Sequence, residues 1–114
     1  MKVILQVEST GLNATWFAAD EVLTVLAIMD QSNCSKLLLW SERQQAVGLF
    51  RASDFNVIDG RLPPQWEASV NATGHVELSP KEWKSPGFWE AYHDADPSAE
   101  KLFRSVADAV MAAC

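Results

Sequence analysis

The sequence has few of the residues that build covalent or metal-based sites. It contains two cysteines, Cys34 and Cys114, and two histidines, His75 and His93, which stand far apart in the chain. Two thiols in a chain long enough to form its own core favour a reducing compartment over a disulfide framework. No CxxC or HxxxH pattern offers a zinc ligand set, and Cys34 at a polar turn is typical of an inert thiol. We therefore expect no metal ion and no cofactor.

Loops that cradle phosphate or hold a nucleophile are also missing. The five glycines are scattered, and no G-x-S-x-G motif is present. Acidic and hydroxyl side chains alternate over 94–100 as at the start of an EF-hand loop, but Ala99 and Ser105 occupy the positions that require glycine and glutamate. These absences predict that the protein is not an enzyme and does not bind calcium.

Long apolar runs are absent. The apolar residues near the N-terminus are interrupted by Gln6 and Glu8, unlike the core of a signal peptide. No run approaches the roughly 20 apolar residues that span a bilayer. We expect a cytoplasmic protein that does not enter a membrane.

Positive charge is scarce. Nine Lys and Arg residues stand against fifteen Asp and Glu residues, which gives a net charge of −6 and a pI of about 4.7. A nucleic-acid binder needs a basic footprint, and an anionic membrane surface repels an acidic protein. The charge leaves two interpretations open: it serves solubility alone, or it attracts a basic partner protein.

The 114 residues fit a single domain, 1–114. Successive strands with short loops between them indicate antiparallel pairing. The sequence therefore predicts an α+β fold: a largely antiparallel sheet of about five to six strands, with an N-terminal βα unit and C-terminal helices packed mainly on one face. We expect strands over 2–8, 36–41, 46–51 (with a bulge at Gly48), 54–59, 65–71 and 75–78, and helices over 18–30 and 97–112.

Three pairs of a capping residue and a proline predict helix starts in the C-terminal third. They are Ser79-Pro80, Ser85-Pro86 and Asp96-Pro97. Glu82 follows Ser79 by three residues and would complete a capping box. Large aromatic residues lie between these caps, and the five tryptophans of the chain are expected in the core or at its rim, with an interface anchor as the alternative.

The hairpin over 65–78 is expected to have a dry face and a wet face. Trp66, Ala68 and Val70 alternate with Glu67, Ser69 and Asn71. His75 and Glu77 join the wet side across the turn. Glu67 and Glu77 can serve as solvated charges, as partner-binding residues, or as a carboxylate pair for acid–base chemistry.

Acidic residues are concentrated between Glu77 and Glu100. Helix N-termini account for three of them, Glu82, Asp96 and Glu100. Alternatively, acidic side chains with an aromatic anchor among them would offer a charged rim to a basic partner. The candidate partner-binding residues are Glu67, Glu77, Glu90, Tyr92, Asp94 and Asp96.

Three runs in the C-terminal half resemble small bacterial immunity proteins of polymorphic and contact-dependent toxin systems. They are LPPQW (62–66), GHVELSPKEW (74–83) and GFWEAYHDADPSAEKLF (87–103). The resemblance implies a cytoplasmic inhibitor that binds the C-terminal toxin domain of a secreted effector. Toxin-contacting residues differ from pair to pair, so none carries over.

Three hypotheses follow for function. The first is an immunity protein that neutralises a cognate, basic, nuclease-type toxin domain. The second is a small enzyme or ligand-binding domain that uses the wet hairpin face around His75, which would require a pocket holding His75, Glu67 and Glu77. The third is a subunit of a homo-oligomer joined through tryptophans; we expect a monomer or a weak homodimer.

Overall fold

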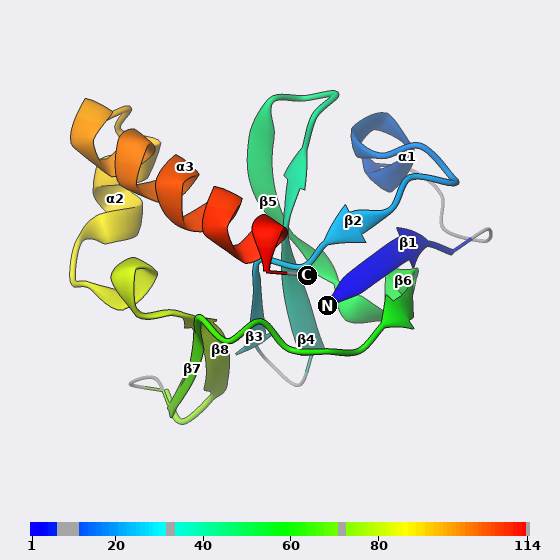
Figure 1. Cartoon of the computed structure of the whole chain (residues 1–114), viewed down its shortest axis with the longest axis horizontal. Coiled ribbons are helices and arrows are strands. Elements are labelled where there is room, and N and C mark those ends of the chain that lie inside the picture. The colour runs from blue at the N-terminus through cyan, green and yellow to red at the C-terminus, as the bar shows by residue number, and fades with distance from the viewer. Residues whose placement is uncertain (7–11, 32–33, 71–72, 114) are drawn as a thin grey trace.

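The computed structural model describes residues 1–6, 12–31, 34–70 and 73–113, and it has an α+β fold. The larger sheet has five antiparallel strands in the order β5-β4-β3-β8-β7 (Figure 1). Its strands are β3 (Ala27–Gln31), β4 (Cys34–Ser41), β5 (Ala46–Arg51), β7 (Trp66–Val70) and β8 (Val76–Pro80). The predicted class and the antiparallel pairing are confirmed.

A second, three-stranded antiparallel sheet has the order β2-β1-β6. It contains β1 (Lys2–Leu5), β2 (Leu23–Thr24) and β6 (Phe55–Asp59). The strand predicted over 54–59 forms, as does the part over 2–5 of the strand predicted over 2–8, whose residues 7–8 lie outside the described residues. The two strands pair with each other in a sheet separate from the larger one. The remaining elements are α1 (Leu12–Trp16), α2 (Phe88–His93), α3 (Pro97–Ala112) and the 3₁₀ turns η1 (Ala52–Asp54) and η2 (Lys81–Lys84).

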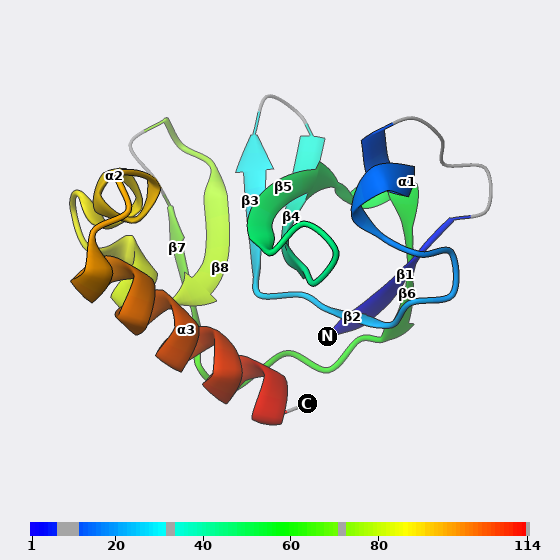
Figure 2. The same ribbon diagram turned by 90° about the horizontal axis from the view of Figure 1, so that it is seen from above.

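The five-stranded sheet forms the middle of three layers. In β4, Leu37 and Leu39 belong to a buried cluster with Val3 and Phe55 of the smaller sheet. Leu38 belongs to a second cluster, with the C-terminal helices. This alternation follows from the two-residue period of a strand, and Figure 2 shows α2 and α3 on one side of the larger sheet and β1, β2 and β6 on the other. The prediction that the C-terminal helices cover one face is confirmed.

The helix predicted over 18–30 is wrong, because this segment forms β2 and β3. Val25 and Leu26 are both fully buried, yet they enter opposite clusters, as neighbouring residues of an extended chain do. An apolar run that is buried all round does not distinguish a helix from a strand inside a layered fold. The β-branched residues Val22, Thr24 and Ile28 favour the strand.

Only one of the three predicted helix caps forms. Asp96 caps α3, where its Oδ1 accepts hydrogen bonds from the backbone N–H groups of Ser98 at 2.8 Å and Ala99 at 3.3 Å. Ser79 instead lies within β8, and η2 has no side-chain cap. Ser85 is the C-cap of η2, and α2 begins three residues later at Phe88, directly after Gly87. The sequence places the prolines correctly at element ends but does not distinguish a helix start from a turn.

Aromatic residues fill both clusters, and each of the five tryptophans is buried or half-buried, as expected for the core or its rim. Gly48 does not form the expected bulge, because β4 and β5 pair in continuous register. A Cβ atom at Gly48 would lie 3.1 Å from the Phe50 ring and 3.6 Å from the Trp16 ring. Glycine at this position lets the two rings approach the strand closely.

Candidate functional site

A cleft of about 760 Å³ lies between the larger sheet and the chain segment 83–93. The segment runs through η2 and α2, and it lies over the sheet face opposite the three-stranded sheet. The sheet contributes apolar side chains from three strands, Met29, Leu38, Val47 and Leu49. The segment contributes the aromatic side chains Trp83, Phe88 and Trp89. The cleft is therefore apolar within.

The segment over the cleft is held in place by a tight turn and by aromatic contacts. Gly87 has a φ of 79°, a left-handed conformation that glycine adopts without strain. Trp83 stacks on Phe103 of α3 with 5.1 Å between the ring centroids. Phe88 and Trp89 meet edge to face at 5.0 Å. These contacts fix the aromatic wall of the cleft to the core.

The polar rim of the cleft carries two carboxylates, Glu77 and Glu90, and two basic side chains, Lys84 and His93. Lys84 donates from Nζ to the main-chain carbonyl of Glu67, so it bridges η2 and β7. His93 stacks on Trp89 with 6.1 Å between centroids. In the part of the chain that the structure describes, the ion pairs are Arg51–Asp54 and Arg61–Asp59. Neither Glu77 nor Glu90 forms an ion pair or a side-chain hydrogen bond with another described residue.

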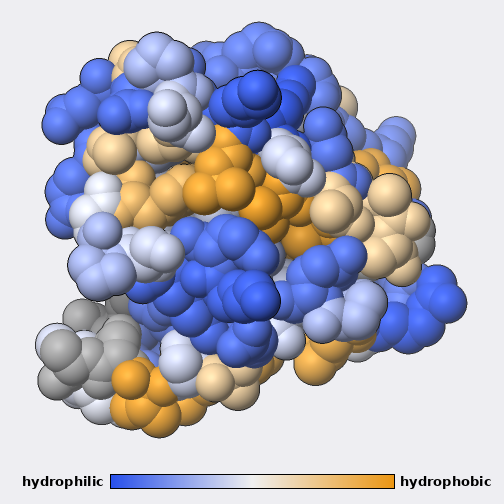
Figure 3. All heavy atoms as spheres, turned by 60° about the vertical axis from the view of Figure 1, so that its left-hand side comes forward, coloured by the Kyte–Doolittle hydropathy of each residue, from blue (hydrophilic) through white to orange (hydrophobic). Residues whose placement is uncertain are grey.

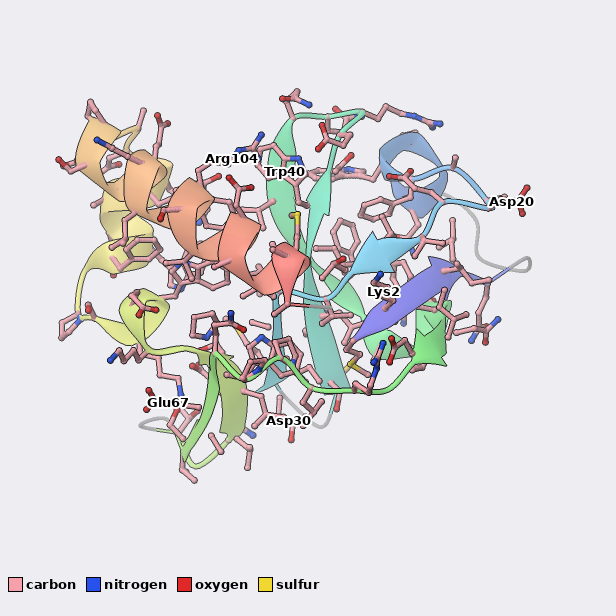
Figure 4. All side chains as sticks on the ribbon, viewed as in Figure 1. Lys2, Asp20, Asp30, Trp40, Glu67 and Arg104 are labelled. Carbon is pink, nitrogen blue, oxygen red and sulfur yellow. The ribbon has the colours of Figure 1, made fainter. Side chains whose placement is uncertain are left out.

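The predicted wet face of the hairpin is the face that lines the cleft. Ser69 of β7 pairs with Glu77 of β8, and both side chains are half-buried there. Glu67 lies on the same face but is exposed and outside the cleft (Figure 4). Ser69 and Glu77 are partly covered, because both face the cleft beneath the segment 83–93.

The predicted dry face of the hairpin is largely exposed. Val70 is 67% exposed and Val76 is 47% exposed, while Trp66 is half-buried and donates from Nε1 to the carbonyl of Leu26 at 2.9 Å. Packing against the cluster of the three-stranded sheet reaches Trp66 but not the hairpin end. Asn71, which was predicted on the wet face, lies outside the described residues.

Two of the predicted partner-binding residues have structural roles. Asp96 caps α3, as described above. Tyr92 is half-buried and packs on Phe103 with 4.8 Å between centroids. Burial, and then the nearby Glu100 carboxylate, raise the pKa of Tyr92 above its ordinary value. Asp94 is exposed directly after α2.

The cleft thus brings Glu77 and Glu90 together, with Glu67 and Asp94 on neighbouring surface. His75 and Glu67 do not line this cleft, so it does not unite the three residues of the enzyme hypothesis. Figure 3 shows this side of the molecule, where apolar surface runs between two hydrophilic regions.

Sequence reasoning missed Trp83, Lys84, Trp89 and His93 as members of the site. The aromatic residues between the prolines indicated a need for burial, but not that they would also form the wall of a cleft. That arrangement depends on the packing of α2 and η2 over β3, β4 and β5, which no local sequence pattern reports.

Other features of the described chain are structural. Hydrogen bonding from Arg61, whose Nη2 lies 2.8 Å from Oδ2 of Asp59, holds the pKa of Asp59 far below its usual range. Over the described ranges, no three His, Cys, Asp or Glu side chains gather in a way that could hold a metal ion. None of the helices described is long and apolar enough to cross a membrane.

Comparison of the chain with known protein families, with curated proteins and with solved structures finds no match.

Proposed function

We propose that this protein is an immunity protein. It binds a cognate, basic toxin domain of the nuclease type in the cytoplasm and blocks that domain without performing chemistry itself. The observation that supports the proposal is the cleft, whose apolar and aromatic interior is bordered by Glu77 and Glu90, two carboxylates that have no ion-pair partner among the described residues.

This arrangement has the features of a protein-binding surface. Interfaces between proteins commonly combine an apolar, aromatic centre with a polar rim. Here the aromatic wall supplies the centre, and Glu77, Glu90 and the nearby Asp94 supply negative charge around it.

Long-range attraction favours the same partner class. The net charge of −6 accelerates the encounter with a positively charged protein, and complementary charges reduce binding to acidic competitors. The resemblance of the C-terminal half to toxin-neutralising immunity proteins points to a toxin domain as that partner.

The test is protection of growing cells. The protein would be co-expressed with the C-terminal toxin domain of an effector encoded beside its gene. We expect growth to be restored by the natural protein, and restored less by the double variant Glu77→Gln/Glu90→Gln. The double variant Asp20→Asn/Glu21→Gln removes the same charge at Asp20, which lies at the far end of the molecule (Figure 4), and at the residue next to it, and should protect fully. Lack of protection by the natural protein would contradict the proposal.

A second candidate function is binding of a small molecule, and the size of the cleft favours it. A volume of about 760 Å³ lies within the range of roughly 300–1,000 Å³ that holds drug-sized ligands. This site differs from the one around His75 that the sequence suggested, because His75 does not line the cleft. A free metabolite and a partner protein are distinguished by the ligand series described below.

A further inference from the structure

We infer that the cleft holds the side chain of an arginine presented by an extended segment of the partner protein. This inference rests on the proposed function and makes it more specific, because it states which residue of the partner enters the molecule. Two features of the cleft support it: the charge at its rim and its aromatic wall.

The charge at the rim favours a cationic occupant. Glu77 and Glu90 both line the cleft, and Glu77 is half-buried, where water screens its charge less. Lys84 donates to the carbonyl of Glu67 and, among the described residues, forms no ion pair with either carboxylate.

The wall of the cleft favours a guanidinium group over an ammonium group. Among the aromatic lining residues, Trp83 and Phe88 are buried, and the half-buried Trp89 offers ring surface in the cleft that the carboxylates border. A guanidinium group is planar and weakly hydrated, so it can stack on an aromatic ring while it donates hydrogen bonds to a carboxylate. The chain itself contains this pairing elsewhere, where Arg104 lies 4.6 Å from the ring centre of Trp40 (Figure 4).

The carboxylates at the rim favour an arginine that is part of a protein segment, because its main chain carries no free carboxylate. Free arginine would instead bring its α-carboxylate toward Glu77 and Glu90, which repel it.

The experiment uses the full chain and the probe Nα-acetyl-arginine N-methylamide. Its uncharged analogue, Nα-acetyl-citrulline N-methylamide, has nearly the same shape. Binding would be followed by NMR through the indole N–H signals of the five tryptophans, assigned with single Trp→Phe variants. We expect a dissociation constant of the order of millimolar for the arginine probe, with the signals of Trp83 and Trp89 shifted, and binding of the citrulline probe at least about tenfold weaker.

Two variants test the role of the carboxylates. Glu77→Gln should weaken binding of the arginine probe about tenfold, and Glu90→Gln about threefold, because Glu90 is exposed and better screened. Asp20→Asn, the matched control at the far end of the molecule, should leave the dissociation constant unchanged.

Three results would overturn the inference. Equal binding of the arginine and citrulline probes would remove the need for charge. Tighter binding of free L-arginine than of the blocked probe would make the cleft a small-molecule site. Shifts confined to other tryptophans would place the probe elsewhere. If the probe binds as expected but no toxin domain is neutralised, the proposed function fails and the arginine site stands.

Discussion

Replacement of Phe103 by alanine would remove the residue on which the aromatic cluster of the C-terminal layer converges. Its ring is 2% exposed and lies between 4.8 and 6.1 Å, centroid to centroid, from the rings of Tyr92, Trp83, Trp40 and Trp89. Truncation of a buried phenylalanine to alanine costs about 3–5 kcal/mol, from lost burial and from the cavity that remains. A chain of this length has a free energy of unfolding of about 6–17 kcal/mol, so the variant should fold but be much less stable.

The neighbouring residue supplies the control. Leu102 precedes Phe103 in α3 but is 40% exposed, so we expect Leu102→Ala to cost less than about 1 kcal/mol. Urea unfolding, followed by tryptophan fluorescence, would measure both variants. With a slope of about 1–3 kcal/mol per molar urea, the midpoint for Phe103→Ala should fall by at least about 1 M. Equal midpoints for the two variants would refute the packing of α3 on the sheet through Phe103.

Three further predictions concern single residues. Tyr92 is the only tyrosine of the chain, so tyrosinate absorbance reports it alone. Burial raises the pKa of Tyr92, so the stability that the neutral side chain contributes is complete below pH ~10, where tyrosine ionises in the unfolded chain. This stability is lost as pH rises through the pKa of the folded state. A titration midpoint of Tyr92 at or below the ordinary pKa of tyrosine would contradict the prediction. Asp96→Ala should lower the free energy of unfolding by about 1 kcal/mol through loss of the α3 cap, whereas Asp94→Ala should change it by less than about 0.5 kcal/mol. Chemical denaturation measures both variants. A larger loss of stability for Asp94→Ala than for Asp96→Ala would contradict the capping role. Gly87→Ala should cost about 1–2 kcal/mol of stability, because φ is 79° there. Gly60→Ala, with no atom within 4 Å of the added Cβ, should be neutral or slightly stabilising in thermal melts. Similar melting temperatures for the two variants would argue against the left-handed turn at Gly87.

Local sequence patterns predicted the elements whose pattern had a single interpretation. The helix over 97–112 combines a cap, a proline and three-four apolar spacing, and the structure places α3 over the same residues. The hairpin of β7 and β8 and that of β4 and β5 also follow from alternation around polar turns. The segment 18–30 failed because apolar residues on every side fit a buried strand as well as a buried helix.

The candidate site was predicted only in part, for a physical reason. Glu77 and Glu90 were selected on charge, and the fold brings them to one cleft. The aromatic wall was not foreseen as part of a site, because it forms where η2 and α2 pack over strands distant in the chain. Tyr92 and Asp96 show the opposite case: their position in an acidic stretch suggested binding, while their contacts in the structure are those of a packed ring and a helix cap.

The most direct measurement of the central claim is the dissociation constant of the complex with the toxin domain, determined by calorimetry for two double variants. Glu77→Gln/Glu90→Gln removes the charge at the cleft, and Asp20→Asn/Glu21→Gln removes the same charge at Asp20, which lies at the far end of the molecule (Figure 4), and at the residue next to it. If the cleft is the binding site, the first should weaken binding about tenfold or more, and the second by less than about twofold. Equal effects of the two variants, or no effect of the first, would contradict the claim that this protein binds its partner through the acidic rim of the cleft.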